Sequence, residues 1–204
     1  ADAGCGKGRQ TLALAGELGV VVHAVDTYQP FLDHLTRRAR KVGLGHLVQA
    51  HCLDMLKIPS ILRHVDLLWS EGAVFNVGFA NALTAWAPVV SPGGFVVVSE
   101  LAWVCEEAPA EVGEFFAVCY PGMMHTDDNV TLAESSGYHV LFTHALPRDA
   151  WVDGLYDVLR PRARALVDHP DPEVKGFAEE TLREIEIFDK FSDSYAYIFY
   201  GLER

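Results

Sequence analysis

The sequence predicts an α/β protein in which a mostly parallel sheet is covered by helices on both faces. Two observations lead to this prediction. Strand-like and helix-like segments alternate over the first hundred residues, and only short turns separate them. The strand-like runs are rich in valine and other apolar residues, which is typical of strands buried on both faces. Connections between such strands are expected to be right-handed crossovers.

The boundaries of the first elements follow from turn residues. Gly19 ends a helix-like run and Pro30 begins the next one, because glycine caps helices and proline fits their first turn. In this part of the chain we expect helices over 9–18, 30–42 and 78–88, strands over 20–26, 47–52, 65–69 and 95–100, and a turn over 91–94.

The second half of the chain has a different pattern. We expect helices over 109–118 and 127–136, a strand over 138–146 and a Tyr-rich final strand over 195–200. Between these two strands, residues 147–192 look like a helical insertion that Pro161, Pro170 and Pro172 break into pieces. We expect one domain, residues 1–204, that begins inside its first strand and lacks the start of that strand and an N-terminal cap, because only Ala1 precedes Asp2.

Composition narrows the function classes. The chain has 204 residues and a net charge of −12, and half of its residues are apolar. An acidic surface repels phosphate backbones, so we expect no nucleic-acid partner. The four cysteines form no C-x-x-C pair, and no run approaches the length of a membrane span. We therefore expect reduced thiols, a cytoplasmic protein, no membrane partner and no metal.

Three alternating glycines, Gly4, Gly6 and Gly8, stand just before the first predicted helix. A glycine turn at a helix N-terminus offers backbone N–H groups to an anionic or nucleotide-like ligand. Arg9 occupies the place of the third glycine of the dinucleotide fingerprint, and Lys7 is followed by glycine, which excludes a P-loop. Asp26, at the end of the next strand, is a two-oxygen acceptor suited to a ribose diol.

In this order and spacing the segments resemble the class I S-adenosylmethionine-dependent methyltransferases. The glycine motif is Asp2–Gly8, and Asp26 matches the acid that binds ribose in that family. Cys52–Met55, Val65–Gly72 and Ser91–Phe95 match the segments at the third, fourth and fifth strands. The Trp-Ser-Glu-Gly sequence and the Tyr-rich last strand are most similar to small-molecule enzymes of the ubiquinone/menaquinone methyltransferase type.

The resemblance implies a Rossmann-like three-layer α/β/α sandwich of seven strands in the order 3-2-1-4-5-7-6, with the last strand antiparallel. It implies S-adenosyl-L-methionine as cofactor and S-adenosyl-L-homocysteine as product. The implied cofactor-binding residues are Asp2, Gly4, Cys5, Gly6, Gly8, Asp26, Thr27, Asp54, Met55, Ser70, Glu71 and Gly72.

Three of these residues could instead have a purely structural role. Asp26 could be a helix N-cap and Asp54 a surface loop residue. Glu71 is the candidate general base, and the alternative is a buried ion-pair partner.

The acceptor is expected to be a small molecule over the carboxyl ends of the fourth and fifth strands, with a homodimer as a possible assembly. Asn76, Trp103, Tyr120 and Trp151 are candidate substrate contacts, although packing is the commoner role of aromatic residues. Two other functions stay open: a nicotinamide-dependent oxidoreductase and a non-catalytic S-adenosylmethionine-binding module. Ser70-Glu71-Gly72-Ala73 replaces the Asn-Pro-Pro-Tyr signature of amino-group methylation, which argues against nucleobase substrates.

Overall fold

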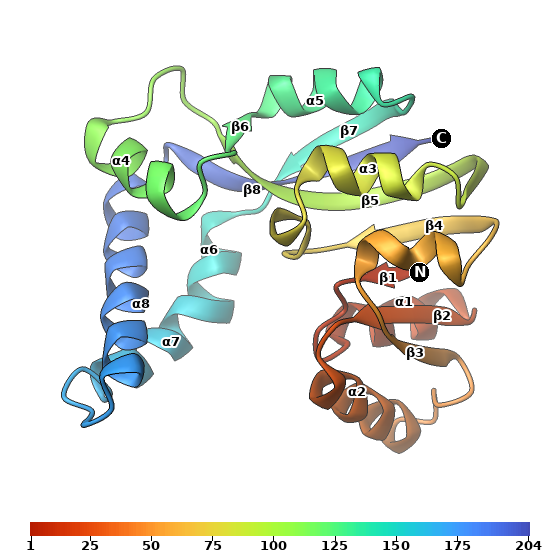
Figure 1. Ribbon diagram of the computed structural model, residues 1–204, viewed down its shortest axis with the longest axis horizontal. Coiled ribbons are helices and arrows are strands. Elements are labelled where there is room, and N and C mark those ends of the chain that lie inside the picture. Colours follow the sequence, from red (N-terminus) through yellow and green to blue (C-terminus); the bar gives the residue numbers. More distant parts are fainter. The chain divides into compact units, whose positions relative to one another are not determined.

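A computed structural model describes residues 1–204 (Figure 1). The chain divides into two compact units. The first contains residues 1–100, 127–144 and 198–204, and the second contains residues 101–126 and 145–197. Two long strands, β5 (Val90–Trp103) and β8 (Tyr195–Glu203), contribute residues to both units.

The strand order is β3-β2-β1-β4-β5-β8-β7, with the short strand β6 paired to β5. The remaining strands are β1 (Asp2–Ala3), β2 (Val22–Asp26), β3 (Val48–Cys52), β4 (Val65–Ser70), β6 (Met124–His125) and β7 (His139–Ala145). Strands β1 to β5 pair in parallel. This order confirms the predicted one, with the last strand between β5 and β7.

Backbone hydrogen bonds show that β8 runs antiparallel to β5. The N–H of Gly93 donates to the carbonyl of Arg204 (2.9 Å), whereas the N–H of Val104 donates to the carbonyl of Ser194 (3.0 Å). Residue numbers therefore rise along β5 as they fall along β8, as predicted.

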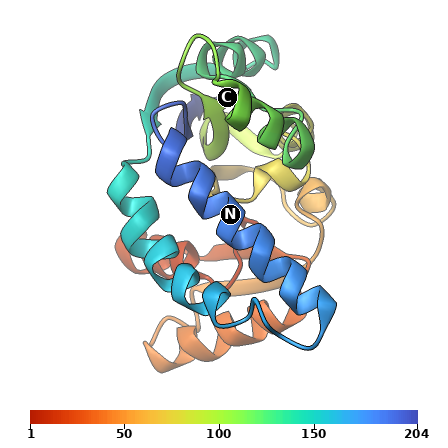
Figure 2. The ribbon, with the colours of Figure 1, turned by 90° about the vertical axis from the view of Figure 1, so that its left-hand side faces the viewer.

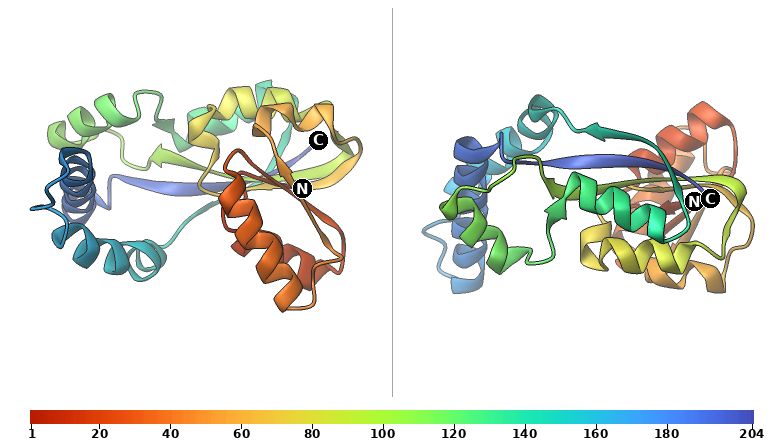
Figure 3. Two further views of the ribbon diagram at one scale, coloured as in Figure 1. Left: turned by 60° about the horizontal axis from the view of Figure 1, so that its bottom comes forward. Right: turned by 90° about the horizontal axis from the view of Figure 1, so that it is seen from above.

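Helices cover both faces of the sheet in the first unit (Figure 3). Helices α1 (Arg9–Leu18) and α2 (Gln29–Lys41) lie on one face, and α3 (Phe79–Trp86) and α5 (Thr126–Ser135) lie on the other. On the second face, Phe79 of α3 packs against the ring of Tyr200, and Asn129 of α5 donates to the Tyr200 hydroxyl (3.1 Å). Two short 3₁₀ turns, η1 (Met55–Ser60) and η2 (Val74–Asn76), follow β3 and β4.

The second unit is mostly helical. It contains α4 (Ala110–Cys119), α6 (Arg148–Trp151), the π-helical turn η3 (Val152–Tyr156), α7 (Asp157–Arg164) and α8 (Pro172–Phe191). Helices α7 and α8 lie side by side, joined by an Arg160–Asp189 ion pair at 2.9 Å (Figure 2). No helix of the protein combines the length and apolar character that a membrane crossing requires.

Two local predictions were wrong. Pro161 lies inside α7 rather than ending a helix, and α7 begins directly after the π-helical turn. Residues 91–94 belong to β5 instead of forming a separate turn. Gly93 has φ +74°, but the backbone groups of Gly93 and Gly94 pair with Arg204, so the strand continues through the irregular stretch.

Candidate active site

The glycine loop between β1 and α1 is held against the end of β2. The N–H groups of Gly4 and Cys5 donate to the carbonyl of Val25 at 2.8 and 3.0 Å. One residue further on, the N–H of Gly6 donates to Oδ2 of Asp26 at 2.8 Å. The structure therefore joins the two segments from which the sequence predicts a nucleotide site, because a side chain of one binds the backbone of the other.

All three glycines of this loop, Gly4, Gly6 and Gly8, have left-handed φ, and for Gly4 and Gly6 the reasons differ. Gly4 has φ +75°, and a Cβ there would lie 2.3 Å from Cβ of Ala73, so only glycine lets the loop pack on the segment after β4. Gly6 has φ +52°, and a Cβ there would meet nothing within 4 Å. Gly6 therefore leaves open space beside the Asp26 carboxylate, as a backbone that a ligand approaches must do.

Asp26 uses both carboxylate oxygens on the backbone. Oδ2 accepts from Gly6, and Oδ1 accepts from the N–H of Tyr28 at 2.8 Å. Tyr28 is the N-cap of α2 and has no side-chain cap of its own. Because each carboxylate oxygen has two acceptor sites, each keeps one for a further donor. The half-buried Asp26 is thus fixed in position and still able to accept from two hydroxyls.

The segment after β3 lies next to this site. The N–H of Leu53 donates to the carbonyl of Asp26 at 2.9 Å. Asp54 is the N-cap of η1, where its Oδ1 accepts from the N–H of Leu56 at 2.9 Å. The carbonyl of Met55 accepts a hydrogen bond from the indole N–H of Trp86 at 3.0 Å. The methyl group of the Met55 side chain lies 3.1 Å from the position that a Cβ on Gly4 would occupy. Thr27, between β2 and α2, is exposed.

The turn after β4 is held by two buried hydroxyl groups. Ser70 is fully buried, and its Oγ donates to the carbonyl of Ala3 at 2.9 Å. The N–H of Gly72 donates to Oγ of Ser99 at 2.8 Å, and Ser99 is 2% exposed. The half-buried Glu71 stands between these anchors. The sequence analysis missed Ser99, although its place near the end of the fifth predicted strand is a signal that could have found it.

Asp2 lies beneath the glycine loop rather than in it. Its side chain is 2% exposed, and Oδ2 accepts from the hydroxyl of Thr11 at 2.5 Å. Burial, with a smaller contribution from the charge of Glu71, raises the pKa of Asp2 to about 6. Burial also raises the pKa of the Cys5 thiol well above its ordinary value, so this cysteine is a neutral packing residue at pH 7.

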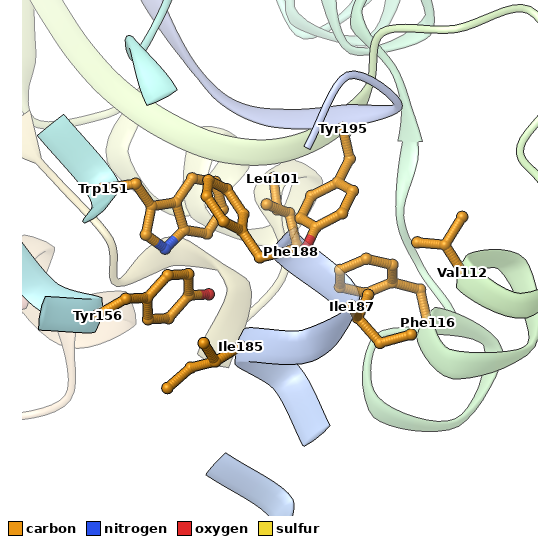
Figure 4. Packing of buried hydrophobic residues seen from close by; sticks show 9 residues of the cluster. All are labelled: Leu101, Val112, Phe116, Trp151, Tyr156, Ile185, Ile187, Phe188 and Tyr195. Atoms are coloured by element: carbon orange, nitrogen blue, oxygen red, sulfur yellow. The ribbon is translucent and has the colours of Figure 1, made fainter. Parts of the chain in front are cut away.

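The candidate substrate contacts fall in both units. Asn76 is exposed at the end of η2 and donates to the carbonyl of Ala73 at 2.9 Å. Trp103, Tyr120 and Trp151 belong to the second unit. Trp151 is 8% exposed and is part of the buried cluster in Figure 4, and Trp103 and Tyr120 pack against that cluster. The cluster consists of Leu101, Val112, Phe116, Trp151, Tyr156, Ile185, Ile187, Phe188 and Tyr195.

Comparison with known proteins agrees with this geometry. A family model described as a methyltransferase domain matches residues 1–98, which lie within the first unit. A search of curated proteins found no match. The described fold is a Rossmann-like α/β sandwich, and the family match covers a little under half of the chain, 98 of its 204 residues.

Solved structures share this fold at low sequence identity. An S-adenosylmethionine-dependent methyltransferase from Geobacter sulfurreducens, in complex with S-adenosyl-L-homocysteine, has a TM-score of 0.81 and 18% identity over 100% of this chain and 83% of its own. The [4+2]-cyclase SpnF has a TM-score of 0.76 and 17% identity over 100% of this chain and 73% of its own.

A geranyl diphosphate C-methyltransferase from Streptomyces coelicolor A3(2) has a TM-score of 0.69 and 16% identity over 100% of this chain and 70% of its own. At these identities the likeness concerns the fold. The match of residues 1–98 to a methyltransferase domain favours methyl transfer over the nicotinamide-dependent alternative.

Proposed function

We propose that the first unit binds S-adenosyl-L-methionine at the glycine loop and supports transfer of its methyl group to a small-molecule acceptor. The observation that carries the proposal is the Gly6–Asp26 hydrogen bond, which joins an open backbone position to a carboxylate with spare acceptor sites. The site fits a nucleoside: a ribose diol has two donors, and Asp26 offers two oxygens.

Each segment around the loop has a role in this proposal. Gly6 lets the backbone approach the methionine portion, with Cys5 packed beneath the loop. Gly4 and Gly8 let the loop pack on Ala73 and Leu35, because a Cβ at these positions would lie 2.3 and 2.2 Å from those side chains. Asp26 and Thr27 hold the ribose, while Asp54 accepts from the adenine amine and Met55 packs on the ring. Asp2 and Ser70 are buried, so they act by fixing the loop and the first strand rather than by direct contact.

The bound cofactor would supply an activated sulfonium methyl group, so the protein mainly has to orient an acceptor in line with the methyl–sulfur bond. Glu71 and Gly72 follow β4, the neighbour of β1 at the centre of the strand order. We assign Glu71 as the general base for acceptors that must lose a proton. Ser99 keeps the Glu71–Gly72 turn in place by accepting the Gly72 N–H.

The proposal extends to a small-molecule acceptor of the ubiquinone/menaquinone methyltransferase type. It is supported by the acidic composition, which disfavours nucleic-acid acceptors, and by the Trp-Ser-Glu-Gly sequence on which the resemblance to that type rests. Asn76, Trp103, Tyr120 and Trp151 remain the proposed acceptor contacts. The four free cysteines support a cytoplasmic protein. We also propose that the protein forms a homodimer.

Calorimetric titration tests the cofactor assignment. We expect S-adenosyl-L-homocysteine to bind and NADH not to bind, and binding of NADH alone would refute the proposal. Incubation with methyl-labelled S-adenosyl-L-methionine and a metabolite extract then tests transfer. Cofactor binding without labelled product would favour the non-catalytic module instead.

Variants at Glu71 and Ser99 distinguish the proposed general base from the residue that holds the Glu71–Gly72 turn in place. Glu71→Gln should lower kcat with little change in KM for the cofactor, if the acceptor must lose a proton. Ser99→Ala removes one hydrogen bond and should lower the unfolding free energy by about 1 kcal/mol. It should also reduce kcat, and Ser99→Thr, which keeps a hydroxyl, should restore part of the loss. Unchanged kcat in Ser99→Ala would contradict the positioning role.

A further inference from the structure

Strand β7 leaves one edge of the sheet unpaired. It is the last strand in the order, beside β8, and it spans seven residues (Figure 1). All of its residues except Val140 are exposed, with Leu141 at 46% and Phe142 at 49%. A free edge of this length presents unpaired backbone donors and acceptors to any other strand.

The edge lacks the features that normally prevent such pairing. Monomeric proteins protect their edge strands with charged side chains, proline, bulges or very short strands. The sequence of β7, His-Val-Leu-Phe-Thr-His-Ala, contains no Asp, Glu, Lys, Arg or Pro. This neutral strand lies in a chain with a net charge of −12. The strand therefore adds no charge repulsion of its own between two copies that meet along this edge.

We propose that β7 pairs antiparallel with β7 of a second copy of this chain, which joins the two sheets edge to edge. Pairing about Phe142, the middle residue of the strand, places Phe142 opposite the partner's Phe142. In the same register Leu141 lies opposite the partner's Thr143, and Val140 opposite the partner's His144. These are aromatic, apolar and β-branched neighbours of the kind that stabilises antiparallel pairs, and no pair brings like charges together. A two-fold axis needs such self-complementarity.

The net charge predicts how this dimer depends on salt. Two chains of −12 repel each other at long range, whereas the paired strands themselves carry no formal charge. Salt screens the long-range repulsion. Added sodium chloride should therefore increase the dimer fraction, the opposite of its effect on an interface made of ion pairs. This inference does not depend on the proposed methyl transfer.

A charge-swap experiment tests both the surface and the register. Light scattering after size-exclusion chromatography should give the mass of two chains for the wild type, with dissociation on dilution. The double variant Leu141→Lys, Thr143→Lys places lysine opposite lysine twice and should give a monomer. The variant Leu141→Lys, Thr143→Glu places lysine opposite glutamate twice and should restore the dimer. Both positions are exposed, so circular dichroism should show folded protein in each case.

Val118→Lys is the matched control, because it adds a lysine at an apolar residue that is 86% exposed on α4. It should leave the dimer unchanged. A monomeric wild type at every concentration and salt level would overturn the proposal, and β7 would then be free for a strand of another protein. A dimer that persists in the lysine–lysine variant, or fails to return in the lysine–glutamate variant, would also overturn it.

Discussion

Replacing Asp26 by alanine perturbs the predicted cofactor site at one group. The Asp26 carboxylate accepts from Gly6 and Tyr28 at 2.8 Å each and keeps one acceptor site on each oxygen. In the proposed complex those two sites receive the ribose hydroxyls. Losing hydrogen bonds to a charged group costs about 1–3 kcal/mol. This loss weakens cofactor affinity by about 5- to 150-fold.

Isothermal titration with S-adenosyl-L-homocysteine measures this effect. Asp26→Asn should lie between the wild type and Asp26→Ala, because its amide keeps one acceptor oxygen but turns an NH₂ group toward one backbone N–H. Asp66→Ala is the matched control. It also removes one negative charge, but Asp66 is exposed near the amino end of β4, away from the glycine loop. Unchanged affinity in a folded Asp26→Ala protein would refute the ribose assignment.

Other consequences concern stability. Gly4→Ala should lower the unfolding free energy by about 2–4 kcal/mol, because the strain of a left-handed backbone adds to overpacking against Ala73. Gly6→Ala should lower the unfolding free energy by only about 1 kcal/mol, from backbone strain alone. Gly6→Ala should in addition weaken cofactor binding. Denaturant titrations and calorimetry separate the two, and equal stability losses would contradict the packing at Gly4. Folding raises the pKa of Asp2 from 3.8 to about 6, so protonation of this carboxyl favours the folded state. The contribution of Asp2 to the free energy of unfolding should therefore fall as pH rises from about 4 to about 6. Asp2→Asn should remove that slope, and a slope that persists in the variant would refute it. Ring nitrogens of His23 and His51 lie 3.0 Å apart, and burial lowers the pKa of both side chains. The stability that the neutral pair contributes is therefore present above about pH 6.5, and it is lost as pH falls through the lowered pKa values of the folded state. Denaturation of His51→Gln over the same pH range should show a weaker acid destabilisation, and an unchanged acid limb would count against the pair.

The sequence was sufficient for those parts of the fold that depend on local patterns. Gly19 and Pro30 mark helix ends through backbone preferences, so α1 and α2 were predicted within one or two residues at each end. Asp26 and Asp54 were predicted at the carboxyl ends of strands, and the structure has them there. That edge is where ligands of open α/β sheets bind.

The rest of the site depends on contacts between distant residues. Ser99 supports Gly72 from 27 residues away, and no periodic pattern indicates such a hydrogen bond. The burial of Asp2 likewise follows from packing around Thr11 and the loop above it. Pro161 within α7 follows a π-helical turn, a local irregularity that apolar spacing does not encode. Trp151 packs against Phe188 and Tyr195, which are 37 and 44 residues away in the sequence, and residue type alone does not indicate such contacts.

The most direct test of the cofactor site is a crystal structure of this protein with S-adenosyl-L-homocysteine. We expect the ribose hydroxyls to lie within hydrogen-bonding distance of both Asp26 oxygens and the homocysteine portion to lie over Gly6. We also expect the adenine ring to lie between Asp54 and Met55. A ligand bound elsewhere, or a ribose that makes no contact with Asp26, would contradict this assignment.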